Sequence, residues 1–167
     1  MLFRSPDAAL VGFSRYLVAR AARAMFLEYL RDDPRALHVL AEVLGSSPFL
    51  GEILIRNPEY FHWLVSQIER SAPDTIEVDE EIDALLVHAE TPGEMLDALK
   101  RLKRREILRV AARDILGRET LQSATAQLSD LAGLVAERAL GVVSPPDRKS
   151  TRLNSSHIQK SRMPSSA

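Results

Sequence analysis

A two-residue pattern, a short polar residue followed directly by proline, recurs along the chain. It occurs at Ser5-Pro6, Asp33-Pro34, Ser47-Pro48, Asn57-Pro58 and Thr91-Pro92. The polar side chain can accept a hydrogen bond from an unpaired amide of a first helical turn, and proline at the first helical position loses no bond that it could have made. Each occurrence therefore predicts the start of an α-helix.

Apolar residues between these positions recur at spacings of three and four, as in Leu37, Leu40 and Leu44, and no strand pattern competes. The sequence predicts an all-α, multi-helix, bundle-like fold. Gly45 and Gly117 follow apolar segments and suit the left-handed residue that closes a helix. Helices are expected near residues 6–31 (with a break around 19–24), 34–44, 48–56, 58–70, 79–89, 92–116 and 119–140, with a loop over 71–78 and a terminating segment over 141–146.

Length and composition limit the kind of protein. The 167 residues are 46% hydrophobic and 5% aromatic, enough for one modest domain. No run of about 18 apolar residues and no signal peptide are visible, so we expect a cytoplasmic protein that does not contact membranes. The absence of cysteine excludes thiol nucleophiles, disulfides and cysteine-bound metals.

The charge is distributed unevenly. The chain carries a net charge of −1, but residues 147–167 hold five basic residues and one acid, which leaves −5 for residues 1–146. A general nucleic-acid binder needs a basic surface. The composition therefore disfavours that class.

Residues 147–167, "DRKSTRLNSSHIQKSRMPSSA", differ in style from the rest. They lack apolar periodicity, and six of the 21 residues are serine. Their reverse translation resembles a widely used short-read sequencing adapter. We therefore expect a helical region over 1–146 and a non-native, disordered tail over 147–167.

Three stretches together resemble one enzyme family: "LAEVLGSSPFLGEILIRNPEYFHWL" (40–64), "LKRREILRVAARDILG" (102–117) and "LQSATAQLSDLAGLVAERAL" (121–140). In order and spacing they resemble the bacterial glutamine synthetase adenylyltransferase/deadenylylase family, which attaches AMP to glutamine synthetase and removes it. The resemblance implies a helical lead-in region that precedes a missing nucleotidyltransferase domain. The stretches "DAALVGFSRYL" and "RETLQSATAQLSDLA" favour the N-terminal, deadenylylating half.

The same resemblance places the chemistry outside this chain. In the family, a glycine-rich stretch and an Asp-x-Asp pair that holds magnesium follow the helix that 121–140 resembles, so the active site would lie beyond Pro146. No catalytic residue, metal ligand or cofactor site is then expected here, and the chain alone should be inactive. For the full enzyme the resemblance implies magnesium with ATP or phosphate, and glutamine synthetase and the PII signalling protein as partners.

One helix face supplies candidate contact residues. At 100° per residue, the face of Leu99 and Leu102 continues as Glu106, Arg109 and Arg113. An unpaired buried guanidinium is very costly, so we expect these three residues to be partly exposed and to contact the missing domain or a partner. Simple surface exposure is the alternative.

The other polar and aromatic groups are interpreted as having structural roles rather than catalytic or ligand-binding ones. The basic run "KRLKRRE" (100–106) has no interleaved aromatic residue and is interpreted as a solvated or partner-facing helix. The acids at 79–81 are expected in a first helical turn, the histidines at 38, 62 and 88 are isolated, and the aromatic group at 60–63 is expected to pack. A free-standing helical interaction domain and, less favoured, a helical nucleic-acid-binding domain remain as alternative functions.

Overall fold

The computed structural model describes residues 5–144, which form eight α-helices and no strand. The all-α prediction is confirmed for this part of the chain. The tail prediction for 147–167 lies outside the described residues. The helices are α1 (Pro6–Ala19), α2 (Arg23–Asp32), α3 (Pro34–Ser46), α4 (Pro48–Arg56), α5 (Tyr60–Ile68), α6 (Thr75–Leu86), α7 (Pro92–Ile115) and α8 (Leu121–Val143).

Four of the five polar-proline pairs begin helices as predicted. Ser5, Asp33, Ser47 and Thr91 each accept a hydrogen bond from a backbone amide of the first turn that follows. Asn57 differs, because its side-chain Nδ2 donates to the carbonyl oxygen of Ile53 at 2.8 Å and so closes α4. The helix after it starts only at residue 60.

The predicted start of α6 was wrong. The helix begins at Thr75, because Asp74 and Glu77 form a reciprocal capping box in which each side chain accepts from the other's backbone amide, at 2.9 and 3.0 Å. The acids at 79–81 therefore lie inside the helix and not in its first turn. The predicted loop over 71–78 ends four residues early, and α8 continues through Gly141 to Val143.

The two glycines expected at helix ends have different roles. Gly117 has a φ of +68° just after α7, as predicted. Gly45 lies inside α3, so its predicted role was wrong. A Cβ at Gly45 would lie 3.2 Å from the Cβ of Ala9, and one at Gly12 would lie 3.1 Å from the Cβ of Leu44. These glycines allow α1 and α3 to pack closely.

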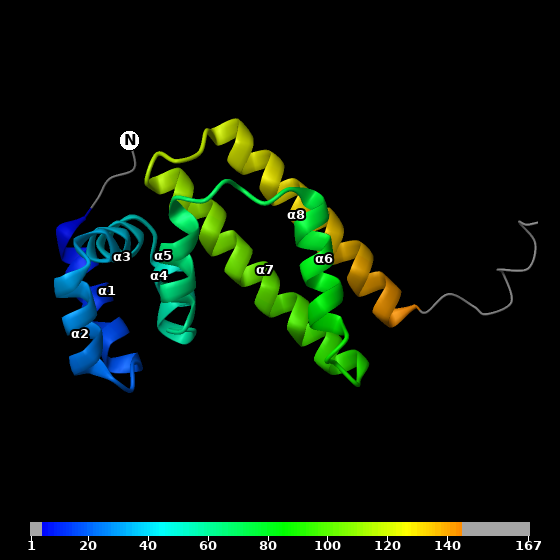
Figure 1. Cartoon of the computed structure of the whole chain (residues 1–167), viewed down its shortest axis with the longest axis horizontal. Helices are drawn as coiled ribbons and strands as arrows, with labels where there is room; N and C mark the ends of the chain where they lie inside the picture. Colours follow the sequence, from blue (N-terminus) through cyan, green and yellow to red (C-terminus); the bar gives the residue numbers. More distant parts are fainter. Residues whose placement is uncertain (1–4, 145–167) are drawn as a thin grey trace, which may run out of the picture.

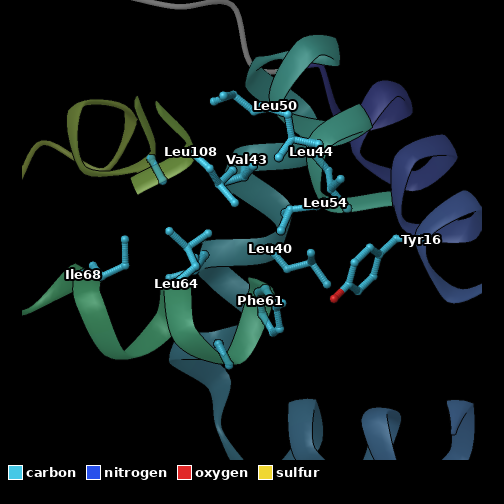
Figure 2. Packing of buried hydrophobic residues seen from close by; sticks show 14 of the residues in the cluster. Tyr16, Leu40, Val43, Leu44, Leu50, Leu54, Phe61, Leu64, Ile68 and Leu108 are labelled. Carbon is cyan, nitrogen blue, oxygen red and sulfur yellow. The ribbon is translucent and has the colours of Figure 1, made fainter. Parts of the chain in front are cut away.

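The larger hydrophobic cluster combines side chains from α1 to α5 with the second half of α7 (Figure 2). Tyr16, Leu40, Leu54 and Phe61 are fully enclosed there. The Tyr16 hydroxyl donates to the carbonyl oxygen of Pro58 at 2.9 Å, which satisfies the one polar atom that this ring brings into the core. Burial raises the pKa of Tyr16 to about 12.

A smaller cluster joins α6, the first half of α7 and α8. Its buried members are Val78, Ile82, Leu99, Leu102 and Leu131. Helix α7 runs diagonally from this cluster to the larger one and belongs to both (Figure 1). Within residues 5–144, no helix is both long and apolar enough to span a lipid bilayer.

Candidate functional site

The three candidate contact residues on α7 are enclosed by the protein itself. Glu106, Arg109 and Arg113 continue the face of Leu99 and Leu102, as the spacing predicts, but they are only 3%, 4% and 7% exposed. The expectation of partial exposure was wrong. The reason is that the end of α5, the segment between α7 and α8, and the first half of α8 supply hydrogen-bonding and charged partners for this face.

Arg113 closes the C-terminal end of another helix. Its Nη1 donates to the carbonyl oxygens of Gln67 and Ile68 at 3.1 and 2.7 Å and also to that of Arg70. Carbonyls at the end of a helix have no partner within the helix, so a buried helix end needs an external donor. The Nε of Arg113 donates to Oε1 of Glu119 at 2.9 Å, which compensates the arginine's charge.

Arg109 continues the same set of contacts toward α8. Its Nε donates to Oε2 of Glu106 at 2.7 Å, and its Nη2 donates to Oε1 of Gln127 at 3.0 Å. The amide of Gln127 donates to Oγ of Ser123 at 3.0 Å, and that hydroxyl donates to Oε2 of Glu119 at 2.7 Å. A continuous hydrogen-bonded path thus connects the two arginines through α8.

Glu119 is held in its anionic form. Burial by itself would raise the pKa of Glu119, but hydrogen bonds from Ser123, Arg113 and Gln127 outweigh that effect and lower the pKa below its ordinary value. The carboxylate is therefore charged at neutral pH and balances Arg113.

Arg105 extends the contacts to α6. Its Nη2 lies 2.6 Å from Oε1 of Glu81 and 3.3 Å from Oε1 of Glu106, and its guanidinium carbon lies 4.5 Å from the ring centre of Trp63. Burial alone would lower the pKa of Arg105, but the two carboxylates raise it. Arg105 therefore stays charged.

These residues form one unit, which we call the charged network. Its charged members are Glu81, Arg105, Glu106, Arg109, Arg113 and Glu119. Three carboxylates balance three guanidinium groups, so the network has no net charge with which to attract an ion. Because Glu106, Arg109 and Arg113 are enclosed and paired, the partner-contact role predicted for them loses its physical basis.

The polar partners on α8 and just before it were not predicted from the sequence. Glu119, Ser123 and Gln127 follow one another at spacings of four, beside the apolar positions Ala124 and Leu131. A short polar stripe next to an apolar one was the available signal. It indicates a buried polar partner on a neighbouring helix.

A small cavity borders the charged network. It has a volume of about 30 Å³ and is lined by Arg109, Gln127 and Asp130 among others. That volume holds about one water molecule. A wider, open pocket of about 250 Å³ borders the same network and is lined by Glu81, Glu106 and Arg109 among others. The Nη1 of Arg109 has no hydrogen-bond partner among the described residues.

The isolated histidines and acids do not assemble into a metal centre. Between residues 5 and 144, no group of three or more His, Asp or Glu side chains is arranged to hold a metal ion. His62 packs on the ring of Tyr29, with ring centres 4.7 Å apart, and its Nε2 lies 3.3 Å from Nη2 of Arg20.

Comparison with known proteins gives a consistent result. The family model for glutamate-ammonia ligase adenylyltransferase matches residues 37–162, a range that extends past Pro146. No solved structure matches the chain significantly.

Several curated relatives carry the name bifunctional glutamine synthetase adenylyltransferase/adenylyl-removing enzyme. The protein from Leifsonia xyli is 34% identical over 140 residues, covering 83% of this chain and 14% of the relative. The protein from Corynebacterium glutamicum is 30% identical over 138 residues, covering 81% and 13%. The chain thus spans about one seventh of the length of the relatives it matches.

Proposed function

Because this chain belongs to the glutamate-ammonia ligase adenylyltransferase family, we propose that it forms a non-catalytic helical part of an enzyme that adenylylates and deadenylylates glutamine synthetase. The three stretches that resemble the family lie on α3 to α5, α7 and α8. Within the described residues, no group of three or more His, Asp or Glu side chains is arranged to hold a metal ion. Catalysis in this proposal takes place on another part of the enzyme.

An exposed face of α8 suggests that this chain packs against the catalytic part of the enzyme. We define the α8 outer face as the exposed residues Leu121, Leu128, Ala132, Ala136, Leu140 and Val143. They share one side of the helix, and none is charged. Leu121, Leu140 and Val143 are 76%, 67% and 67% exposed. The face is free of charge and apolar except for the hydroxyls of Thr125 and Ser129. Such a face is typical of a surface that packs against another part of a protein.

The finer parts of the proposal follow from the family. The enzyme would use magnesium with ATP or phosphate, would respond to the PII signalling protein and would act in the cytoplasm. The segment "DAALVGFSRYL", which forms part of α1, supports the deadenylylating half as the origin of this chain. A free-standing helical interaction domain is the competing function.

A chimeric enzyme tests the proposal. Residues 6–143 would replace the matched segment of the Corynebacterium glutamicum relative, and adenylylation of glutamine synthetase and AMP release would be measured. We expect the chimera to be active. An inactive but folded chimera would favour the free-standing interaction domain.

Variants of the chimera test the α8 outer face. The double change Leu140→Lys/Val143→Lys should lower both activities at least about tenfold, since lysine cannot be buried in an apolar contact without a large cost. The matched control Leu10→Lys/Val18→Lys changes two equally exposed apolar residues on α1 and should have little effect. Equal losses in both variants would contradict the proposed packing surface.

The isolated chain provides a second test. It should release no AMP from adenylylated glutamine synthetase above a heat-inactivated control, because the described residues provide no site for the metal ion that the chemistry requires. Measurable release would contradict the non-catalytic role.

A further inference from the structure

The outer side of α7 carries a concentrated positive charge. We call Lys100, Arg101, Lys103 and Arg104 the basic patch, and all four are exposed. At 100° per residue they cover one continuous arc of about 160° around the helix. The opposite side of the same turns is formed by Leu99 and Leu102, which are buried in the smaller cluster.

Asp97 is the one carboxylate paired with the basic patch within the described residues. Lys100 pairs with Asp97 at 2.9 Å, and Arg104 donates only to the backbone carbonyl of Lys100. Arg101 and Lys103 form neither an ion pair nor a hydrogen bond within residues 5–144. Several exposed arginines elsewhere are paired with carboxylates, as in Arg15–Glu52, Arg31–Asp32 and Arg118–Glu69, whereas the exposed Arg23 donates only to a backbone carbonyl.

Helix α6 carries a cluster of acidic residues. The sequence of α6 contains Glu77, Asp79, Glu80, Glu81 and Asp83 and no basic residue. Arg138 of α8 pairs with Asp79 and Asp83, and Arg105 pairs with Glu81. Asp97 offsets one of the four cations, so the basic patch keeps an excess of three positive charges, although residues 1–146 have a net charge of −5.

The aromatic residues beside the basic patch help to define the partner. Tyr60 and Trp63 of α5 are only half-exposed, and the guanidinium of Arg105 lies over the Trp63 ring at 4.5 Å. That ring face is not open for stacking by a nucleic-acid base. An acidic polypeptide needs only exposed cations, which the basic patch supplies.

We infer that the basic patch docks an acidic surface of another polypeptide. Each cation–carboxylate pair formed there is solvent-exposed and contributes up to about 1 kcal/mol, so several pairs give a weak, salt-sensitive contact. This docking goes beyond the proposed function, because it stands on the charges of α7 and requires no catalytic part.

Poly-L-glutamate is the probe for the test, and Trp63 is the reporter. Trp63 is the only tryptophan of the chain and contacts Arg105, which directly follows the basic patch. Its fluorescence would be followed during titration of the full 167-residue chain at low ionic strength. Binding to basic residues far from Trp63 would leave this signal unchanged.

Two triple variants distinguish the effect of the basic patch on binding from the effect of the net charge of the chain. Arg101→Gln/Lys103→Gln/Arg104→Gln removes three unpaired cations of the patch, whereas Arg31→Gln/Arg56→Gln/Arg118→Gln removes three exposed, paired arginines elsewhere. Both lower the net charge by the same amount. The patch variant should bind about tenfold more weakly, and the control should stay within about twofold of the unchanged chain. Circular dichroism verifies that both variants remain helical.

Three results would overturn the inference. One is the absence of any Trp63 response in the unchanged chain, and another is equal weakening in the two variants. The third is tighter binding of a single-stranded oligonucleotide than of poly-L-glutamate at equal charge concentration, which would identify a nucleic-acid surface instead. None of these results depends on the activity of the chimeric enzyme.

Discussion

At the scale of single residues, Arg113 shows how a buried guanidinium can be accommodated without an external partner. Its Nε, Nη1 and Nη2 all donate within the protein, to Glu119 and to backbone carbonyls at the end of α5 and after α7. The spacing along α7 correctly placed Arg113 on the face of Leu99 and Leu102. It could not reveal what covers that face, since backbone carbonyls more than 40 residues away leave no mark in the side-chain sequence.

Replacement of Arg113 should be strongly destabilising. Arg113→Met leaves the carboxylate of Glu119 and the last carbonyls of α5 without their donor, so the free energy of unfolding should fall by about 3–5 kcal/mol. Arg118→Met removes an exposed partner of Glu69 and should cost less than about 1 kcal/mol. Urea denaturation measures both. A cost for Arg113→Met as small as that of the control would show that the charged network contributes little to stability.

His62 should make stability depend on pH. Burial, and then the nearby charge of Arg20, hold the pKa of His62 below its ordinary value of 6.5. The unfolded chain therefore takes up the proton first as pH falls, so this contribution to stability is complete above about pH 6.5 and is lost progressively below it. The urea midpoint should drop between about pH 7.5 and pH 5.5, and less so in His62→Gln. An identical drop in both proteins would assign the effect to other groups.

At the scale of helices, the ends follow from local hydrogen bonding wherever proline marks them. The sequence correctly predicted α4 at 48–56 and the interruption between α1 and α2. It missed the start of α6, because the capping residue Asp74 is followed by Thr75 rather than by proline and Pro73 lies before the cap. Gly45 was misinterpreted for a related reason: a glycine needed for close packing and a glycine needed for a helix end look alike in sequence.

Two glycines in helix interiors should respond oppositely to alanine. Glycine weakens a helix by about 1 kcal/mol relative to alanine, so Gly133→Ala on α8, where no atom lies within 4 Å of the new Cβ, should stabilise the protein by about 0.5–1 kcal/mol. In Gly12→Ala the new Cβ would lie 3.1 Å from the Cβ of Leu44, and overpacking should outweigh the helix gain. Thermal denaturation of both variants measures the difference. A clear rise of Tm in Gly12→Ala would show that α1 and α3 can separate at little cost.

At the scale of the whole molecule, the helices sort into two hydrophobic clusters connected by α7. Apolar periodicity predicted the helices and most of their buried sides. It did not predict the two clusters, because which stripe faces which depends on contacts between distant parts of the chain. Ile107 illustrates this, since it packs against both clusters from one position on α7.

Removal of residues 147–167 should leave this arrangement intact. That segment has no periodic apolar stripe that could dock on either cluster, so a chain ending at Pro146 should keep its helix content and its Tm within error. Circular dichroism during a thermal ramp tests this expectation. A lower Tm in the shortened chain would indicate that the segment contributes to the fold.

Helix α7 is long enough to connect the two hydrophobic clusters mechanically. Its 24 residues extend about 36 Å, and the side chains at its two ends are embedded in different clusters. A tilt of about 5° about one end displaces the other by about 3 Å, which is comparable to the length of one hydrogen bond. A displacement of α6 and α8 would therefore reach the larger cluster through α7, which contacts α3, α4 and α5 there.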